Sequence, residues 1–145
     1  MAKKKIGIIG GGVIGTALGY FLKDYDEAEV TIFEKNTIGS GTTAKSAGTH
    51  CLIDDSVAHE FWSVRLFGFK FYTGMEEKEP GSAGFEKTGT LTVAPYDDYE
   101  NYVLQAIDLT LASGYHAEYW RDPAKIHEII PDLNLDGIMG AGYCP

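Results

Sequence analysis

The chain has 145 residues, a formal net charge of −9 and two cysteines. A chain of this length usually makes one domain and buries roughly two-thirds of the surface it exposes when unfolded, which excludes a large multidomain enzyme. The acidic balance argues against nucleic acid as a partner, because phosphates are bound through Lys and Arg.

The first 34 residues predict a strand, a glycine turn, a helix and a second strand. Residues 5–9 form a short buried strand, 10–12 the turn, 13–23 the helix and 30–34 a β-branched and aromatic strand. Two strands joined by such a crossover are parallel neighbours, with a right-handed connection. The sequence therefore predicts an α/β fold that begins with a Rossmann-like nucleotide-binding βαβ unit and a parallel sheet.

The rest of the chain predicts a long polar loop and then mixed helices and strands. Residues 36–55 are rich in Gly, Ser and Thr and too long for a simple connector, so we expect them to be functional. In chain order we then expect a helix at 56–78, a strand at 86–96, a helix at 97–114, a strand at 117–120, a helix at 122–131 and the start of a strand within 135–145.

Three of the expected helices carry further signals in their sequence. An Asp cap opens and Gly114 closes the helix at 97–114, and Asp122 caps the next helix, with Pro123 at its first position. The helix at 56–78 is amphipathic, and we expect its apolar side to be core rather than a cofactor site. That side consists of Val57, Phe61, Val64, Phe67, Phe71 and Met75.

The glycine turn carries the motif GxGxxG, in Gly10, Gly12 and Gly15. Gly10 allows the tight turn, Gly12 lets the backbone approach a pyrophosphate, and Gly15 lets the helix pack on the strand. The diphosphate would lie on the free N–H groups at the start of the helix. Glu34, at the end of the second strand, is placed to accept hydrogen bonds from an adenosine ribose. Gly19, one turn after Gly15, thins the helix face on the sheet.

The βαβ unit alone leaves NAD and FAD open, and the segments around it add a resemblance. "IGIIGGGVIGTALGYFL", "VTIFEK" and above all "IGSGTTAKSAG" at residues 38–48 resemble the FAD-dependent amine and amino-acid oxidoreductases of the D-amino-acid oxidase type. That family includes glycine oxidase, sarcosine oxidase and L-proline dehydrogenase. Nearly the whole chain aligns in order with this family, but only the first 50 residues carry motifs that are specific to it. The resemblance implies an FAD-binding region at 1–80 and the start of a mixed α+β substrate domain at 81–145, which we expect to be truncated.

The resemblance also implies which residues line the cofactor, through backbone amides, hydroxyls and one charge. Lys45 stands where an Arg is common, and it can offset diphosphate charge without making a bidentate fork. Some relatives attach flavin covalently through a histidine that follows a Trp; His50 has no Trp near it, so we expect noncovalent FAD, and Cys51 as a packed residue. The expected cofactor-binding residues are Gly10, Gly12, Val13, Ile14, Gly15, Glu34, Lys35, Ser40, Gly41, Thr42, Thr43, Lys45, Ser46, Ala47 and Gly48.

The implied chemistry is oxidation of a C–N bond in a small amine or amino acid, with hydride passing to flavin N5 and the imine then hydrolysed. No catalytic residue can be assigned, because the family's substrate residues lie mostly beyond residue 145; we expect His59, His116 and His127 to be noncatalytic. The chain alone should have no turnover and should self-associate or need a partner that supplies the missing half. An NAD-linked dehydrogenase domain and a noncatalytic nucleotide-binding module remain as alternatives.

The cysteines and the N-terminus bear on location. Cys51 and Cys144 are far apart and form no CxxC, so they indicate neither a disulfide framework nor a zinc site, and the acidic clusters lack EF-hand spacing. "MAKKK" before an apolar run resembles a signal peptide, but "GGG" interrupts that run, and no stretch reaches the ~20 apolar residues that span a bilayer. We therefore expect a cytoplasmic protein with no metal and no membrane span.

Overall fold

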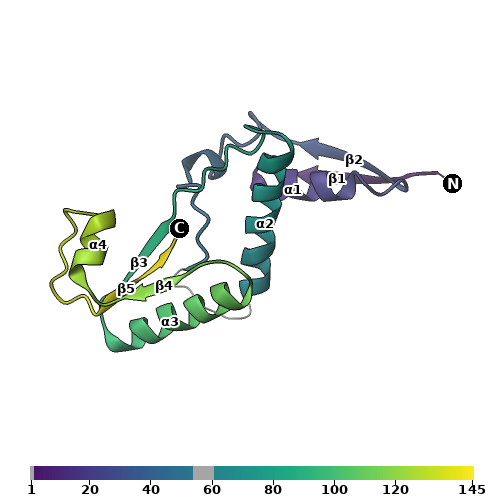
Figure 1. Ribbon diagram of the computed structural model, residues 1–145. Coiled ribbons are helices and arrows are strands. Elements are labelled where there is room, and N and C mark those ends of the chain that lie inside the picture. The colour runs from purple at the N-terminus through teal and green to yellow at the C-terminus, as the bar shows by residue number, and fades with distance from the viewer. Residues whose placement is uncertain (1, 54–60) are drawn as a thin grey trace. The chain divides into compact units, whose positions relative to one another are not determined.

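The computed structural model describes residues 2–53 and 61–145. The chain divides into two compact units, Met1–Thr49 (unit 1) and His50–Pro145 (unit 2), and each is described by itself. Figure 1 follows the elements along the chain. This division follows the packing of the chain and does not test the functional regions expected from the sequence. The FAD-binding region at 1–80 and the substrate domain at 81–145 therefore stay predictions. In the described residues no helix is long and apolar enough to cross a membrane.

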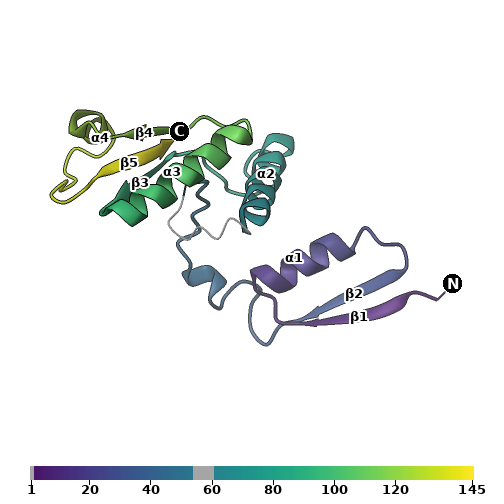
Figure 2. The ribbon, with the colours of Figure 1, turned by 90° about the horizontal axis from the view of Figure 1, so that it is seen from below.

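Unit 1 is the predicted βαβ unit. Strand β1 (Lys4–Ile9), helix α1 (Val13–Leu22) and strand β2 (Ala28–Phe33) follow one another, and the strands pair in parallel with Ile9 opposite Phe33. Figure 2 shows α1 lying along the two strands. The carboxyl ends of both strands therefore meet at the same edge, beside the glycine turn.

Two glycines let α1 lie close to the strands, as predicted. A Cβ on Gly15 would overlap the carbonyl oxygen of Gly10 and lie 3.3 Å from Cγ2 of Ile8. A Cβ on Gly19 would lie 2.9 Å from Cδ1 of Ile32. Both distances are below ordinary van der Waals separation. A side chain at Gly15 would push the helix off the sheet because it meets backbone, whereas a Cβ at Gly19 would displace only the end of the Ile32 side chain.

The expectation that β1 is buried is wrong for most of its length. Ile8, which faces α1, is 9% exposed, whereas Ile9 is 94% exposed and its partner Phe33 is 60% exposed. Successive residues of a strand point to opposite faces, and in unit 1 a helix covers only one of them. The strands of unit 1 have the apolar composition that is typical of a sheet buried on both faces, but within this unit only one face is covered.

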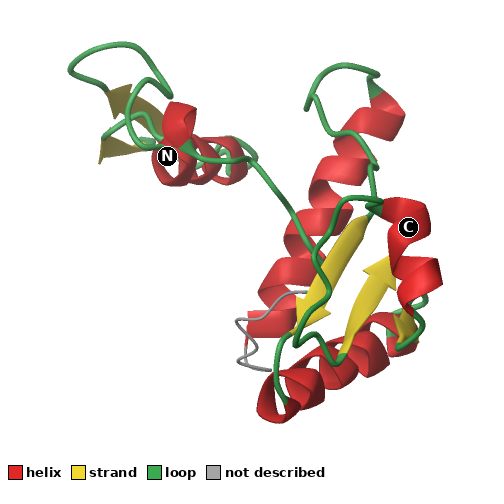
Figure 3. Ribbon diagram, turned by 90° about the vertical axis from the view of Figure 1, so that its left-hand side faces the viewer, coloured by secondary structure: helices red, strands yellow, loops and turns green. Residues whose placement is uncertain are grey.

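Unit 2 is a three-stranded antiparallel sheet with helices, and its strand order is β3-β5-β4. Figure 3 shows the strands with α3 across one face. The tail predicted to start a strand is thus the central strand of the sheet. The elements are α2 (Trp62–Lys78), β3 (Thr90–Ala94), α3 (Asp97–Ala112), β4 (Glu118–Trp120), α4 (Pro123–Ile129) and β5 (Gly140–Cys144).

The core of unit 2 lies between α3 and the sheet. Gly142 of β5 makes room for α3, because a Cβ there would lie 2.7 Å from Cγ1 of Val103. At the side of this core the buried Glu100 accepts hydrogen bonds from the Tyr119 hydroxyl at 2.7 Å and from Arg121 Nη2 at 2.8 Å. The buried apolar cluster consists of Ile53, Ala94, Val103, Ala106, Ile107 and Ala117.

The helix ends confirm two predictions and correct one. Asp122 caps α4 by accepting from Ala124 N–H at 3.0 Å, with Pro123 first in the helix. Gly114, with φ +85°, follows the end of α3. However, the N-cap of α3 is Tyr96 without a side-chain hydrogen bond, so the expected Asp cap is wrong. The acidic residues of its first turn still favour the positive end of the helix dipole.

Helix α2 ends at Lys78 as expected, while the expected start at residue 56 and Val57 lie outside the described residues. The prediction that its apolar stripe forms core is wrong for Phe61, Val64 and Phe67, which are 57–65% exposed. The helix has aromatic residues on a second side, where Phe69 contacts Phe85 and Tyr115. Because the helix has two apolar sides, the spacing of apolar residues does not show which of them is buried.

Candidate functional site

The glycine turn joins the carboxyl edge of the strands to the start of α1. Gly10 has φ +102°, a conformation that favours glycine, and its N–H donates to the Phe33 carbonyl at 2.8 Å. The expected roles of Gly10 in the tight turn and of Gly15 in close packing are confirmed by this geometry. The turn therefore presents its backbone at the edge where Glu34 follows β2.

The first turn of α1 has N–H groups that the helix itself does not satisfy. The N-cap, Gly12, has no side chain to offer, and the first intrahelical bond runs from Thr16 N–H to the Gly12 carbonyl at 2.9 Å. Thr43 Oγ1 accepts from Val13 N–H at 3.0 Å. The N–H groups of Ile14 and Gly15 come before Thr16, which donates the first intrahelical bond, so the helix provides no acceptor for them. They are available to an anion at the positive end of the helix.

The Glu34 carboxylate bridges the glycine turn and the loop after β2. Its Oε2 accepts from Gly11 N–H at 2.8 Å, and its Oε1 accepts from Asn36 N–H at 2.9 Å. These bonds, Gly11 first, hold the pKa of Glu34 below its ordinary value of 4.5. The carboxylate is thus ionised at neutral pH, and each oxygen retains a lone pair for a hydroxyl donor.

The loop that follows folds back on the turn. Gly39 N–H donates to the Gly11 carbonyl at 2.9 Å, and Ala44 N–H donates to the Gly39 carbonyl at 2.9 Å. The short 3-10 helix η1 (Thr43–Lys45), which the sequence analysis did not expect, then presents Thr43 to α1. Three segments of unit 1 therefore converge on one site: the glycine turn, the end of β2 and η1.

Other expected site residues lie on the same loop, and their ligand contacts stay a prediction. The Ser40 and Ser46 hydroxyls donate to nearby carbonyls, those of Thr37 at 2.6 Å and Thr43 at 3.0 Å. Each hydroxyl oxygen still has acceptor capacity. The remaining expected residues, all exposed, are Lys35, Gly41, Thr42, Lys45, Ala47 and Gly48.

Sequence reasoning missed two contributors to this site. Gly11 is buried against the loop, where its Cβ would lie 3.1 Å from Cγ1 of Ile38. Thr43 was expected to contact a ligand, but its capping of α1 from 30 positions away was not. The available signal was the absence of Ser, Thr, Asp or Asn at the start of α1, which leaves a cap to be supplied from elsewhere.

The three described histidines, His50, His116 and His127, each have different neighbours. His50 packs on α2, where a Cβ on Gly68 would lie 2.6 Å from its Nε2, and burial lowers its pKa. His116 bonds to Glu118 at 3.0 Å and His127 to the Leu133 carbonyl at 3.1 Å. His59 lies outside the described residues. In residues 2–53 and 61–145, no three His, Cys, Asp or Glu side chains gather as a metal site would require.

The chain is similar to a known family and to several solved structures. The family described as FAD dependent oxidoreductase matches residues 5–145. The mitochondrial dimethylglycine dehydrogenase of Rattus norvegicus is 29% identical over 140 residues, which is 95% of this chain. The solved L-proline dehydrogenase of P. horikoshii superposes with a TM-score of 0.72 at 25% identity over 99% of the chain. Glycine oxidase of Bacillus cereus ATCC 14579 gives 0.64 at 26% identity, also over 99%.

The chain spans a minor part of each of these proteins. It covers 16% of the dimethylglycine dehydrogenase, 37% of the L-proline dehydrogenase and 39% of the glycine oxidase.

Proposed function

The chain belongs to the family of FAD dependent oxidoreductases, and on this premise we propose that unit 1 binds the ADP half of a noncovalent FAD. The whole protein would oxidise the C–N bond of a small amine or amino acid. The observation that carries the proposal is the meeting of unsatisfied N–H groups at the start of α1 with the ionised Glu34 beside the glycine turn.

The residues present fit the two polar parts of an ADP group. The N–H groups of Ile14 and Gly15, at the positive end of α1, would hold the diphosphate. Glu34 would accept the ribose hydroxyls and repel a 2′-phosphate. The hydroxyls of Ser40, Thr42 and Ser46, on the loop after β2, would hold the diphosphate or the ribityl chain.

Noncovalent attachment is supported by the surroundings of His50. Its ring contacts Phe69 and Tyr72 of α2, with ring centroids 6.1 Å away in each case. A ring held in this way serves packing, and its lowered pKa favours the neutral form. The family match favours FAD over the NAD-linked alternative.

FAD, when bound, would accept a hydride from the substrate carbon. The described residues bind and orient the nucleotide end of the cofactor. Dimethylglycine, glycine and L-proline are named in the similar proteins, and all are small amines or amino acids, which supports the proposed substrate class. Residues 81–145 would begin the substrate region, and no side chain of this chain is assigned a proton transfer.

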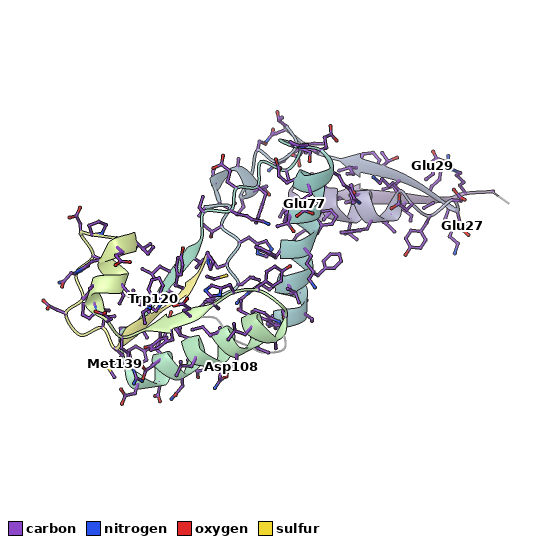
Figure 4. The ribbon with its side chains drawn as sticks, viewed as in Figure 1. Glu27, Glu29, Glu77, Asp108, Trp120 and Met139 are labelled. Carbon is purple, nitrogen blue, oxygen red and sulfur yellow. The ribbon has the colours of Figure 1, made fainter. Side chains whose placement is uncertain are left out.

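The proposal is tested by titrating the chain with ADP, FAD and 2′-phosphoadenosine ligands by calorimetry. We expect ADP and FAD to bind weakly and with similar affinity, because only the ADP half is held. Gly12→Val should remove binding, whereas Gly74→Val, placed where a Cβ meets open space, should not. Glu34→Ala should weaken ADP binding by about 10- to 150-fold, the value of charge-assisted hydrogen bonds. Glu29→Ala, at the start of β2 (Figure 4), should leave it unchanged.

The outcomes separate the alternatives. Equal ADP affinity in Gly12→Val and the native chain would show that the glycine turn does not hold the diphosphate. ADP binding with turnover of sarcosine, glycine or L-proline by this chain alone would refute the expectation that the chain has none. ADP binding by a full-length protein that reduces no dye with these substrates would favour the noncatalytic module.

We also propose that the uncovered faces of unit 1 drive self-association, or bind a chain that completes the sheet. Ile9 and Phe33 are exposed on the face opposite α1, and parallel sheets are normally covered on both faces. Sedimentation should show oligomers of the native chain that Phe33→Lys dissociates. Asp26→Lys, at an exposed position between α1 and β2 and outside this face, is the matched control. Oligomers that persist in Phe33→Lys, or that Asp26→Lys dissociates equally, would contradict the proposal.

A cytoplasmic location is proposed as well, from the two cysteines, which form no CxxC and indicate no disulfide framework. The similar dimethylglycine dehydrogenase is named as mitochondrial. Imaging a C-terminal fluorescent fusion in the source cells separates the two locations.

A further inference from the structure

The chain's two cysteines lie at opposite ends of the sequence of unit 2. Cys51 is the second residue of that unit, and Cys144 is the last residue of its central strand β5. Both are free and partly buried. Their sequence separation indicates no disulfide, but the packing of unit 2 places the two ends together.

The segment that contains Cys51 lies on the core face of β5. Ile53 is fully buried, and its Cγ2 would lie 3.1 Å from a Cβ on Gly142. The Ile53 carbonyl accepts from the Thr92 hydroxyl at 2.8 Å, and Thr92 is the β3 partner of Gly142. Ile53 is thus anchored over the middle of β5.

The direction of the segment follows from what occupies the two ends of β5. Positions two residues from Gly142 share its face, and they are Gly140 and Cys144. The space over Gly140 is filled by the Tyr119 ring, whose Cζ would lie 2.6 Å from a Cβ there. Cys144 and Tyr119 both pack against the core cluster that contains Ile53. Because the Tyr119 ring already fills the space over Gly140, the Cys144 end is the one left for Cys51, two residues before Ile53.

The electrostatics of the thiols agree with this placement. Burial raises the pKa of Cys144, and the charge of Cys51 raises it further. This direction agrees with the placement argued from Gly142 and Ile53.

We propose that Cys51 and Cys144 are a redox-active dithiol that a hydroperoxide converts to an intramolecular disulfide. The Cys51 thiol gives up its proton, and its sulfur attacks the terminal oxygen of the hydroperoxide. The O–O bond breaks, and the other oxygen leaves with that proton as an alcohol, or as water from hydrogen peroxide, giving a sulfenic acid at Cys51. The Cys144 sulfur then attacks the Cys51 sulfur; the S–O bond breaks and the hydroxyl leaves as water with the Cys144 proton. The two thiols together lose two electrons, which reduce the hydroperoxide. The bond would fasten the segment that follows unit 1 to β5.

The test exposes the reduced chain to hydrogen peroxide, blocks remaining thiols with an alkylating reagent and measures intact mass and cross-linked peptides. We expect a monomer with both cysteines protected, two hydrogens lighter, and one peptide pair joining Cys51 to Cys144. Cys51→Ser and Cys144→Ser should each lose this product. Two alkylated thiols, intermolecular dimers alone, or a sulfinic acid at one cysteine would each overturn the proposal.

A second measurement removes any dependence on the folding of the variants. Native packing raises the effective concentration of one thiol at the other, so the native chain should form the disulfide at least roughly tenfold faster than the same chain in denaturing urea. An equal or faster rate in urea would show that the fold does not bring the thiols together.

Discussion

Replacing Gly15 by alanine should destabilise unit 1 far more than replacing Gly19, although both glycines lie in α1 and face the sheet. Each change gains about 1 kcal/mol of helix propensity. At Gly15 the new methyl overlaps the Gly10 carbonyl oxygen and lies 3.1 Å from its carbonyl carbon, so backbone must move. Overpacking typically costs about 1–3 kcal/mol, and a rigid backbone obstacle places this case at the upper end. The net loss is about 2 kcal/mol.

At Gly19 the obstacle is Cδ1 of Ile32 at 2.9 Å, the end of a flexible side chain. Its rotation costs about 1 kcal/mol, which the propensity gain offsets, so the net change is near zero. Hydrogen exchange of the β1 and β2 amides, read by mass spectrometry, should be about 30-fold faster in Gly15→Ala and nearly unchanged in Gly19→Ala. Equal protection in the two variants would refute the claim that the Gly10 carbonyl limits the approach of α1.

Three further results are expected. The lowered pKa of Glu34 means that its bond to Gly11 is present above the ordinary value of 4.5 and is lost as the pH falls through the lower folded value; exchange of the Gly11 amide against pH, with a carboxyl NMR titration, measures this. Thr43→Val should destabilise the start of α1 by about 1 kcal/mol and Thr43→Ser by much less, because only the hydroxyl caps the helix; equal exchange rates in α1 would contradict this. Burial and then the bond to Glu100 raise the pKa of Tyr119 to about 12, so an ultraviolet titration should contain one late phenol that Tyr119→Phe removes.

The order of elements was predictable because each is a local property of the sequence. The β-branched run at the second strand, the glycine turn and the Asp122–Pro123 start of α4 depend on neighbouring residues alone, and the structure has all three. The family could also be identified from local motifs, since GxGxxG and residues 38–48 are contiguous. Burial was predicted less well: Ile9 and Phe67 are apolar in the right periodicity yet exposed, because periodicity identifies a face without identifying what covers it.

The residues of the site can be named from the sequence alone, because glycines permit a positive φ and a close approach, and Glu34 follows the second strand of the βαβ unit. The way these residues are joined depends on the packing of whole elements. Thr43 caps α1 from across unit 1, Glu34 bonds the glycine turn, and Ile53 anchors its segment over the middle of β5. These contacts join residues 23 to 39 positions apart. No local pattern encodes them, because the partner of a polar group is chosen by the packing of whole elements, which brings distant residues within hydrogen-bonding distance.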